Sequence, residues 1–143
     1  MKALMILLSL VYSLFAINSV DAAFVLSFHE DYPTALVQAK EEKRFLMLVI
    51  IKDPCDYSER MVYNTLSDPE VVKALEPFVS VIVDKNTFLP LQFKVDLVPM
   101  VYFIDPKNEE IIHERMGYVH VKQFLDDIKE AHIFTTKNKR KKP

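Results

Sequence analysis

Glycine, cysteine and tryptophan are almost missing from this chain of 143 residues. It contains one glycine (Gly117), one cysteine (Cys55) and no tryptophan. A single glycine excludes glycine-rich phosphate-binding loops and glycine-rich linkers. A single cysteine excludes a disulfide within the chain, so the Cys55 thiol is inert, joined to another molecule, or chemically active.

An excess of charge of one sign is also missing. The chain has 18 Lys and Arg against 20 Asp and Glu, a net charge of −2, which does not favour a nucleic-acid partner. The histidines, at positions 29, 113, 120 and 132, have no metal-ligand spacing with one another or with Cys55. We interpret them as surface or cap residues and expect no metal, no other cofactor and no nucleic acid.

The amino terminus has the order of a secretory signal. Met1-Lys2 precedes an apolar run at 3–16, and a more polar stretch follows with Val20 and Ala22. Small residues at those two positions suit a signal peptidase, so residues 1–22 are predicted to be removed. The run is shorter than the roughly 20 residues that span a bilayer. An uncleaved anchor or a buried helix are the alternatives. Export would place the protein in a periplasm, outside the cell or in a secretory lumen.

The carboxy terminus is basic. Five of its last seven residues are Lys or Arg. A block of like charge at a chain end is typical of a disordered tail, which we place at residues 135–143. The alternative is attraction to an anionic membrane surface. Between the signal and the tail, residues 23–134 are predicted to form one domain.

Apolar runs alternate with helical patterns through this domain. Strands are predicted at Phe45–Ile51, Phe78–Asp84, Met100–Ile104 and Ile111–Met116. Helices are predicted at Asp31–Lys43, Cys55–Leu66, Pro69 to about Pro77 and Val121–Ala131, with a short helical turn around Leu89–Phe93. Continuous apolar runs are typical of strands covered on both faces. The alternation and the late hairpin predict an α/β domain of three layers, a central mixed sheet flanked by helices.

Four features, in this order, resemble the thioredoxin superfamily. They are Cys55-Asp56-Tyr57-Ser58 at a helix start after the first strand, Met61 followed by Ser67-Asp68-Pro69-Glu70-Val71, Val98-Pro99 before the third strand, and Gly117-Tyr118 before the last helix. The resemblance covers roughly residues 34–131 and is closest to exported thioredoxin-like proteins. It implies the thioredoxin fold, with Pro99 in cis and facing Cys55.

The chain departs from the family at three positions. Ser58 replaces the second cysteine of the usual Cys-x-x-Cys motif, and Pro54 replaces the frequent tryptophan before the first. Val49 stands where thioredoxin has a buried aspartate, which serves proton transfer for the second thiol. The loss of that aspartate is consistent with the loss of the thiol that it serves. Together these losses predict poor turnover as a disulfide reductase.

Cys55 is the candidate catalytic residue. A thiolate attacks a disulfide, and the start of a helix favours negative charge. The carboxylates of Asp53 and Asp56 oppose that effect, whereas Lys52 supports it only if its side chain turns toward the loop. We expect a modestly activated thiol, with an inert cysteine as the alternative.

Ser58 is the second candidate catalytic residue. Its hydroxyl is no sulfur nucleophile and cannot resolve a mixed disulfide. It can donate a hydrogen bond to the Cys55 thiolate, or it can be an ordinary residue of a first helical turn.

The loop and the proline are candidates for substrate binding. The resemblance implies that the backbone next to Pro99 pairs with a bound polypeptide as an added strand, so that Val98 contacts it. The alternative is a trans proline that opens a strand. Pro54, Asp56 and Tyr57 complete the candidate binding residues, and Tyr57 is interpreted as an exposed recognition ring.

Two functions fit these residues. The first is thiol–disulfide exchange on exported proteins through Cys55 alone, with polypeptide thiols or disulfides as partners and an external thiol that resolves the mixed disulfide. Isomerisation or removal of a small-thiol adduct needs only one cysteine. The second is a module without redox chemistry that holds a polypeptide beside Cys55 and Pro99, as a chaperone or assembly factor.

Overall fold

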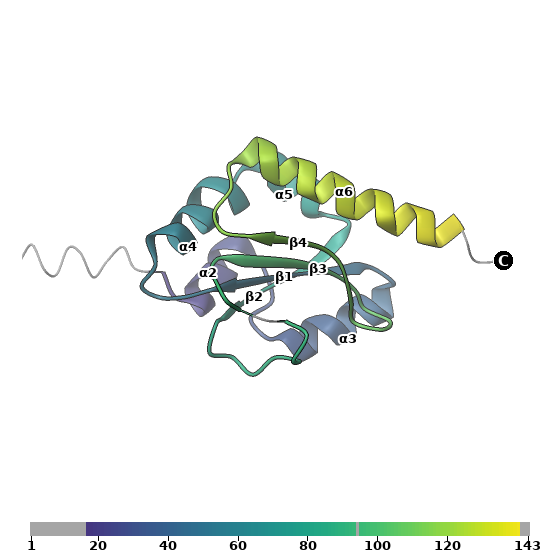
Figure 1. Ribbon diagram of the computed structural model, residues 1–143, viewed down its shortest axis with the longest axis horizontal. Helices are drawn as coiled ribbons and strands as arrows, with labels where there is room; N and C mark the ends of the chain where they lie inside the picture. The colour runs from purple at the N-terminus through teal and green to yellow at the C-terminus, as the bar shows by residue number, and fades with distance from the viewer. Residues whose placement is uncertain (1–16, 94, 141–143) are drawn as a thin grey trace, which may run out of the picture.

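The computed structural model describes residues 17–93 and 95–140. Its elements are α2 (Ser19–Leu26), α3 (Tyr32–Glu42), β1 (Phe45–Ile51), α4 (Asp56–Arg60), the π-helix η1 (Met61–Leu66), α5 (Pro69–Leu75), β2 (Phe78–Asp84), β3 (Met100–Asp105), β4 (Glu110–Met116) and α6 (Val121–Arg140) (Figure 1). Residues 1–16 of the predicted signal, Lys94 of the predicted domain and residues 141–143 of the predicted tail lie outside the described residues.

A mixed four-stranded sheet forms the middle layer. Its strand order is β2-β1-β3-β4. β1 runs parallel to β2 and antiparallel to β3, and β4 returns antiparallel to β3. The three-layer α/β prediction is confirmed.

Strand β1 is buried on both faces. Successive side chains of a strand point to opposite sides of the sheet. Met47, Val49 and Ile51 enter the core formed with α2, η1, α5 and α6. Leu46, Leu48 and Ile50 enter the core formed with α3 and the β2–β3 connection. Both cores need apolar side chains, which explains the unbroken apolar run that the sequence shows here.

Two helices begin at aspartate caps, at the helix starts that the sequence predicts. The Asp31 carboxylate accepts a hydrogen bond from the Thr34 backbone N–H at 2.8 Å at the start of α3. Hydrogen bonds from Thr34 lower the pKa of Asp31 below its usual value. Asp68 accepts from the Glu70 N–H at 2.9 Å at the start of α5. Such caps satisfy backbone donors that the first helical turn leaves without partners.

The helix predicted at Cys55–Leu66 has two parts. It begins as α4 with Cys55 as the N-cap and continues as the π-helix η1. Thr65 in η1 is fully buried, and its hydroxyl donates to the Val119 carbonyl oxygen at 2.6 Å. This bond ties η1 to the segment that leads into α6. The expected helical turn around Leu89–Phe93 is a single hydrogen-bonded turn, from the Phe93 N–H to the Pro90 carbonyl oxygen.

The last helix is longer than the sequence indicated. α6 continues through residues 135–140, where we expected a disordered tail. Lysine and arginine are good helix formers, and the buried Thr135 keeps the helix in contact with the domain beyond Ala131. The disordered tail is therefore corrected to a helix as far as Arg140.

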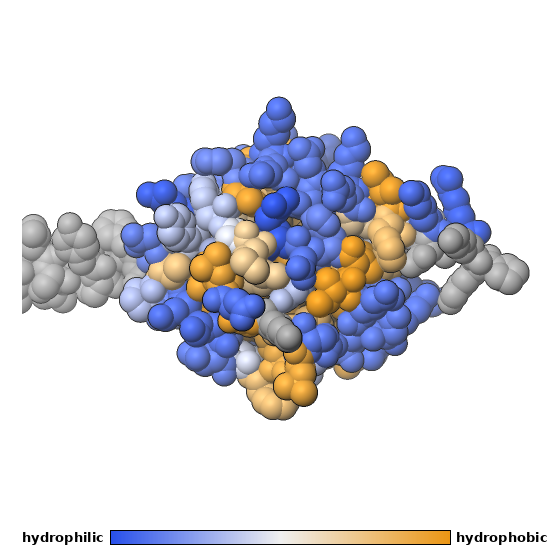
Figure 2. Space-filling view, viewed as in Figure 1, coloured by the Kyte–Doolittle hydropathy of each residue, from blue (hydrophilic) through white to orange (hydrophobic). Residues whose placement is uncertain are grey.

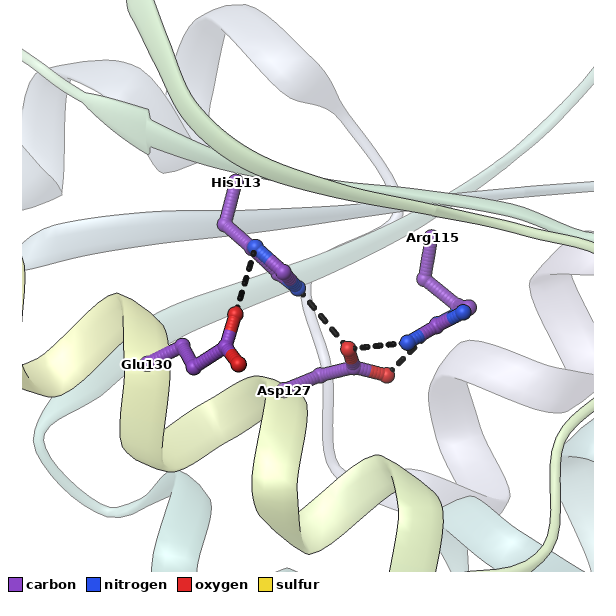
Figure 3. Close-up of polar contacts among 4 residues, drawn as sticks. All are labelled: His113, Arg115, Asp127 and Glu130. Atoms are coloured by element: carbon purple, nitrogen blue, oxygen red, sulfur yellow. Dashed lines mark hydrogen bonds and ion pairs between the residues drawn. The ribbon is translucent and has the colours of Figure 1, made fainter.

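A polar cluster fixes α6 to β4. The carboxylate of Asp127 is 3% exposed and accepts from Arg115 Nε at 2.7 Å and from Arg115 Nη2 at 2.6 Å. His113 Nε2 lies 2.8 Å from the same carboxylate, and its Nδ1 lies 3.5 Å from Glu130 (Figure 3). Our interpretation of His113 as a surface or cap residue is corrected, because it is a strand residue bonded to a buried carboxylate.

The folded unit also begins earlier than residue 23. Ile17, Ala22 and Ala23 are buried in the core, and Asn18 caps α2 by accepting from the Asp21 N–H at 2.9 Å. The predicted cleavage after Ala22 falls inside this helix. Small apolar residues suit both a signal peptidase and a tightly packed helix, so the sequence pattern does not separate the two. No helix within residues 17–140, Lys94 aside, is long and apolar enough to cross a membrane.

Candidate active site

Cys55 lies between the end of β1 and the first turn of α4. Its backbone is extended, and its carbonyl oxygen accepts the first helical bond, from the Glu59 N–H at 3.0 Å. The thiol is free, half-buried and makes no capping hydrogen bond. The sulfur is therefore placed at a helix start and is partly open to solvent.

Pro99 stands at the same edge of the sheet. Ile50, one residue before the end of β1, pairs with Met100, the first residue of β3, so Pro99 comes just beyond this pair. The Pro99 carbonyl oxygen accepts from the Gly117 N–H at 2.8 Å. The end of β1, the start of β3 and the end of β4 thus meet where the chain leaves the sheet for α4 (Figure 1).

The peptide bond before Pro99 is cis, as the resemblance implied. The bond between Asp53 and Pro54 is also cis, which nothing in the sequence indicated. Pro99 is buried, Val98 is half-buried and Pro54 is exposed. Val98 and Pro54 are thus reachable from solvent, whereas Pro99 is not.

Ser58 is turned inward. It is fully buried, and its Oγ accepts a hydrogen bond from the Lys52 backbone N–H at 3.3 Å. Within the described part of the chain no hydrogen bond joins Ser58 to the Cys55 sulfur. The hydroxyl therefore connects the first turn of α4 to the end of β1.

The charges around Cys55 are mostly negative. Asp53 and Asp56 are exposed on either side of it, and Glu59 follows one turn later. Lys52 is exposed too, and among the residues that the structure describes it forms no ion pair. Carboxylates near a thiolate raise its energy, whereas the helix start lowers it, so the two effects oppose one another.

Apolar side chains are exposed on α4 and on the β2–β3 connection near this edge. Tyr57 is 59% exposed and Leu97 54% exposed. Leu97 packs close to Gly117, since its Cδ2 would lie 3.9 Å from a Cβ at that glycine. Farther along the β2–β3 connection Phe88 and Leu91 are almost fully exposed. Figure 2 shows apolar surface gathered over this connection, at the lower edge of the view.

Phe88, Leu91 and Leu97 were missed as candidates in the sequence. They stand in a connection without a clear period, so the pattern does not say whether they face the core or the solvent. Their neighbour Phe93 is buried in the same connection. Only tertiary contacts separate these two classes of residue.

The histidines do not gather with acidic residues or Cys55 into a metal site in the described ranges. His113 is instead bonded to the buried carboxylate of Asp127. His120 stacks edge-on against Tyr118, with ring centroids 5.2 Å apart.

Comparisons with known proteins agree with this geometry. In solved structures, a thioredoxin from Thermus thermophilus is 26% identical with a TM-score of 0.67, over 74% of this chain and 87% of that one. The oxidised DsbD C-terminal domain of Neisseria meningitidis is 19% identical with a TM-score of 0.59, over 73% and 98%. A DsbH oxidoreductase is 19% identical with a TM-score of 0.55, over 82% and 87%. The last two show a shared fold alone.

Curated protein sequences gave no match. The thioredoxin-like family, however, matches residues 27–106, which is more than half of the chain and includes β1, the Cys55 loop and Pro99. The chain therefore belongs to the thioredoxin-like family.

Proposed function

We propose that the protein carries out thiol–disulfide exchange on exported polypeptides through Cys55 alone. The observation that carries the proposal is the placement of Cys55. Its thiol is free and half-buried at the first turn of α4, in a member of the thioredoxin-like family, and at the same sheet edge as the Val98–Pro99 cis bond.

The exchange needs one thiolate and two steps. The Cys55 thiolate attacks one sulfur of a substrate disulfide, a mixed disulfide forms at Cys55, and the other substrate sulfur leaves as a thiolate. An external thiolate then attacks the mixed disulfide, forms a disulfide with the substrate sulfur and releases Cys55 as a thiolate. The substrate then has one free thiol and one mixed disulfide with the external thiol. A second external thiolate attacks that mixed disulfide and frees the substrate sulfur, so two external thiols supply the two electrons of net reduction and leave as their own disulfide. If the substrate's own second thiolate attacks instead, the substrate disulfide is reformed or rearranged with no net redox change.

Ser58 supports a one-cysteine mechanism. A second thiol at this position is what releases a stalled adduct in a dithiol enzyme, and a serine hydroxyl does not replace it. The buried hydroxyl instead bonds to the Lys52 N–H, which keeps the loop in place. The adduct at Cys55 is thus expected to persist until another thiol arrives.

The substrate is a polypeptide in this proposal. Tyr57, two residues after Cys55, and Leu97, two residues before Pro99, are exposed and are our candidates for apolar contacts with the substrate. We expect the backbone at Val98 to pair with it as an added strand. Asp53 and Asp56 disfavour acidic sequences at the same place. We therefore expect an apolar or basic segment next to the substrate disulfide.

The experiment is adduct formation at Cys55. The protein is mixed with an oxidised peptide that carries one disulfide, trapped with acid, and analysed by non-reducing gel and mass spectrometry. We expect one mixed disulfide per chain, which disappears on addition of glutathione. The variant Cys55→Ser is the matched control and gives no adduct.

A second candidate function is polypeptide binding without redox chemistry. The almost fully exposed Phe88 and Leu91 favour it, because such side chains suit a binding surface. The rate of Cys55 alkylation as a function of pH distinguishes thiol–disulfide exchange from polypeptide binding without redox chemistry. A thiol that reacts near neutral pH with small disulfides supports exchange, and an unreactive thiol on a chain that still binds the reduced peptide supports the binding module.

We also propose export, on the basis of the signal-like start at residues 1–22. The mass of the exported protein gives its first residue. A chain that begins at Ala23 loses the Asn18 cap and half of α2, whereas a chain that begins upstream of Asn18 keeps α2 whole. Intact Met1 on a form that is never exported contradicts the proposal.

A further inference from the structure

Helix α6 has two parts with different surroundings. Phe124, Ile128 and Ala131 are buried against the sheet and η1, and Asp127 bonds to Arg115. Thr135 is the last buried residue of α6 among those whose burial the structure describes, and its hydroxyl donates to the His132 carbonyl oxygen at 2.7 Å. From there the helix projects beyond the sheet, at the right in Figure 1. We call residues 131–140, which include this projecting part, the α6 extension.

The charge of the chain changes sign along this helix. Residues 126–130 include three acidic side chains, whereas residues 131–143 contain five Lys or Arg and no Asp or Glu. The rest of the chain is therefore net acidic, because the whole chain has a net charge of −2. The α6 extension and the residues after it form a separate basic end.

Apolar side chains accompany these charges. Ile133 is 43% exposed and Phe134 is 38% exposed, with Lys137 and Arg140 exposed beyond them. Figure 2 shows apolar surface between hydrophilic side chains along the far half of α6, at the upper right. This apolar surface lies outside both cores.

The spacing places these residues on one side of the helix. Lys129, Ile133, Lys137 and Arg140 recur at intervals of four, four and three residues, which is the repeat of one helical face. Phe124, Ile128, Ala131 and Thr135 recur in the same way on the opposite, buried face. The outward face thus has basic residues around an isoleucine, with Phe134 beside it.

We propose that the outward face of the α6 extension binds the surface of an anionic lipid bilayer. Lysine and arginine near such a surface are attracted to the negative lipid headgroups. An apolar side chain among them enters the boundary between headgroups and acyl chains, and two such signals together give more stable attachment than one. The charge of the extension is complementary to this partner, and Ile133 and Phe134 fit it better than they fit a purely polar polyanion such as nucleic acid.

Attachment of this kind leaves the candidate active site open. α6 packs on one face of the sheet, and its carboxy-terminal end lies at the opposite end of the molecule from the start of α4 in Figure 1. The membrane proposal does not depend on the reactivity of Cys55, so failure of the proposed exchange would not contradict it.

The test measures binding of the full chain to phosphatidylcholine vesicles with and without phosphatidylglycerol, by flotation. We expect binding only with phosphatidylglycerol, and weaker binding at high salt. Each charge removed in Lys137→Gln and Arg140→Gln should weaken binding about fivefold. Ile133→Ser should weaken it several-fold at every salt concentration, because the apolar contact is not screened.

The matched control is Lys40→Gln with Lys43→Gln, two exposed lysines on and after α3. This pair should bind as the unchanged protein does. Equal binding to vesicles without phosphatidylglycerol overturns the proposal, since the apolar residues 3–16 then suffice. An equal loss of vesicle binding in the control pair also overturns the proposal. Binding of duplex DNA that depends on Lys137 and Arg140, without vesicle binding, assigns the extension to nucleic acid instead.

Discussion

The backbone N–H of Lys52 donates a hydrogen bond to the hydroxyl oxygen of Ser58 at 3.3 Å. Ser58 is fully buried, so the bond connects the residue after β1 to the first turn of α4 across the Cys55 loop. The position of the missing second cysteine therefore retains a structural bond that shapes the loop around the remaining one.

Replacing Ser58 with alanine should lower the free energy of unfolding by about 1 kcal/mol, because the Lys52 N–H loses its partner and the site keeps its volume. Urea unfolding measures the change. The exposed Thr87→Ala is the control and should be neutral. An unchanged stability in Ser58→Ala would mean that water replaces the hydroxyl at no cost.

Replacing Ser58 with cysteine should create a pair that closes on itself and raise reduction of insulin disulfides in the presence of a small thiol. The adduct at Cys55 should become short-lived, since the new thiol attacks it. The gain should be partial because Val49 is an apolar residue of the core and accepts no proton from the second thiol. The double variant Cys55→Ser, Ser58→Cys controls for the new thiol, and equal turnover in both would show that Cys55 has no part in the reaction.

Replacing Asp127 with alanine should destabilise the fold by about 2 kcal/mol, because Arg115 and His113 lose the carboxylate that they share. The figure is below that of a fully buried ion pair, since the Arg115 side chain is 32% exposed. Thermal and urea unfolding measure it. Glu130→Ala removes the other carboxylate near His113, which is 70% exposed, and should have little effect. A similar loss in both variants would show that the cluster contributes only surface charge.

Replacing Tyr32 with phenylalanine should flatten the loss of stability at alkaline pH. Tyr32 is buried and donates to Glu109 Oε1 at 2.8 Å. Burial, with the hydrogen bond to Glu109, raises the pKa of Tyr32 far above its ordinary value.

The sign follows from the proton count. Below about pH 10 both states keep the Tyr32 proton, and above it only the folded state does, so unfolding releases a proton and stability falls by up to about 1.4 kcal/mol per pH unit. Urea unfolding between pH 9 and 11, on the scale of that tyrosine pKa, measures the slope. The exposed Tyr63→Phe is the control and should keep the slope of the unchanged protein.

Much of the sheet was predictable because its signals are local. β1 and β2 have the bounds that their apolar runs indicated, since a strand covered on both faces contains few polar residues. Asp31 and Asp68 mark helix starts by bonding to backbone groups two or three residues away. The order of these elements was enough to indicate a three-layer α/β domain and to place Cys55 at a helix start, whereas the thioredoxin fold was implied by the resemblance of four short motifs.

Other features depend on partners between 6 and 54 residues away that no local pattern identifies. The buried Ser58 accepts a hydrogen bond from the Lys52 N–H, and Thr65 donates one to the carbonyl oxygen of Val119. The Asp127 carboxylate bonds to Arg115 and His113 of the neighbouring strand β4. The residues themselves gave no period or motif that names these partners. Each bond joins segments that come together only after the sheet has formed.

The two chain ends show most clearly this difference between local sequence signals and tertiary contacts. An apolar run with small residues predicts a signal, and a basic run predicts a tail, because both patterns are matters of composition. Burial of Ala22 and Ala23 in α2 and the continuation of α6 to Arg140 depend on the surface that the rest of the domain offers. Composition determines whether a segment by itself is disordered or helical in water, whereas packing against a formed core determines which of these states it has in the folded protein.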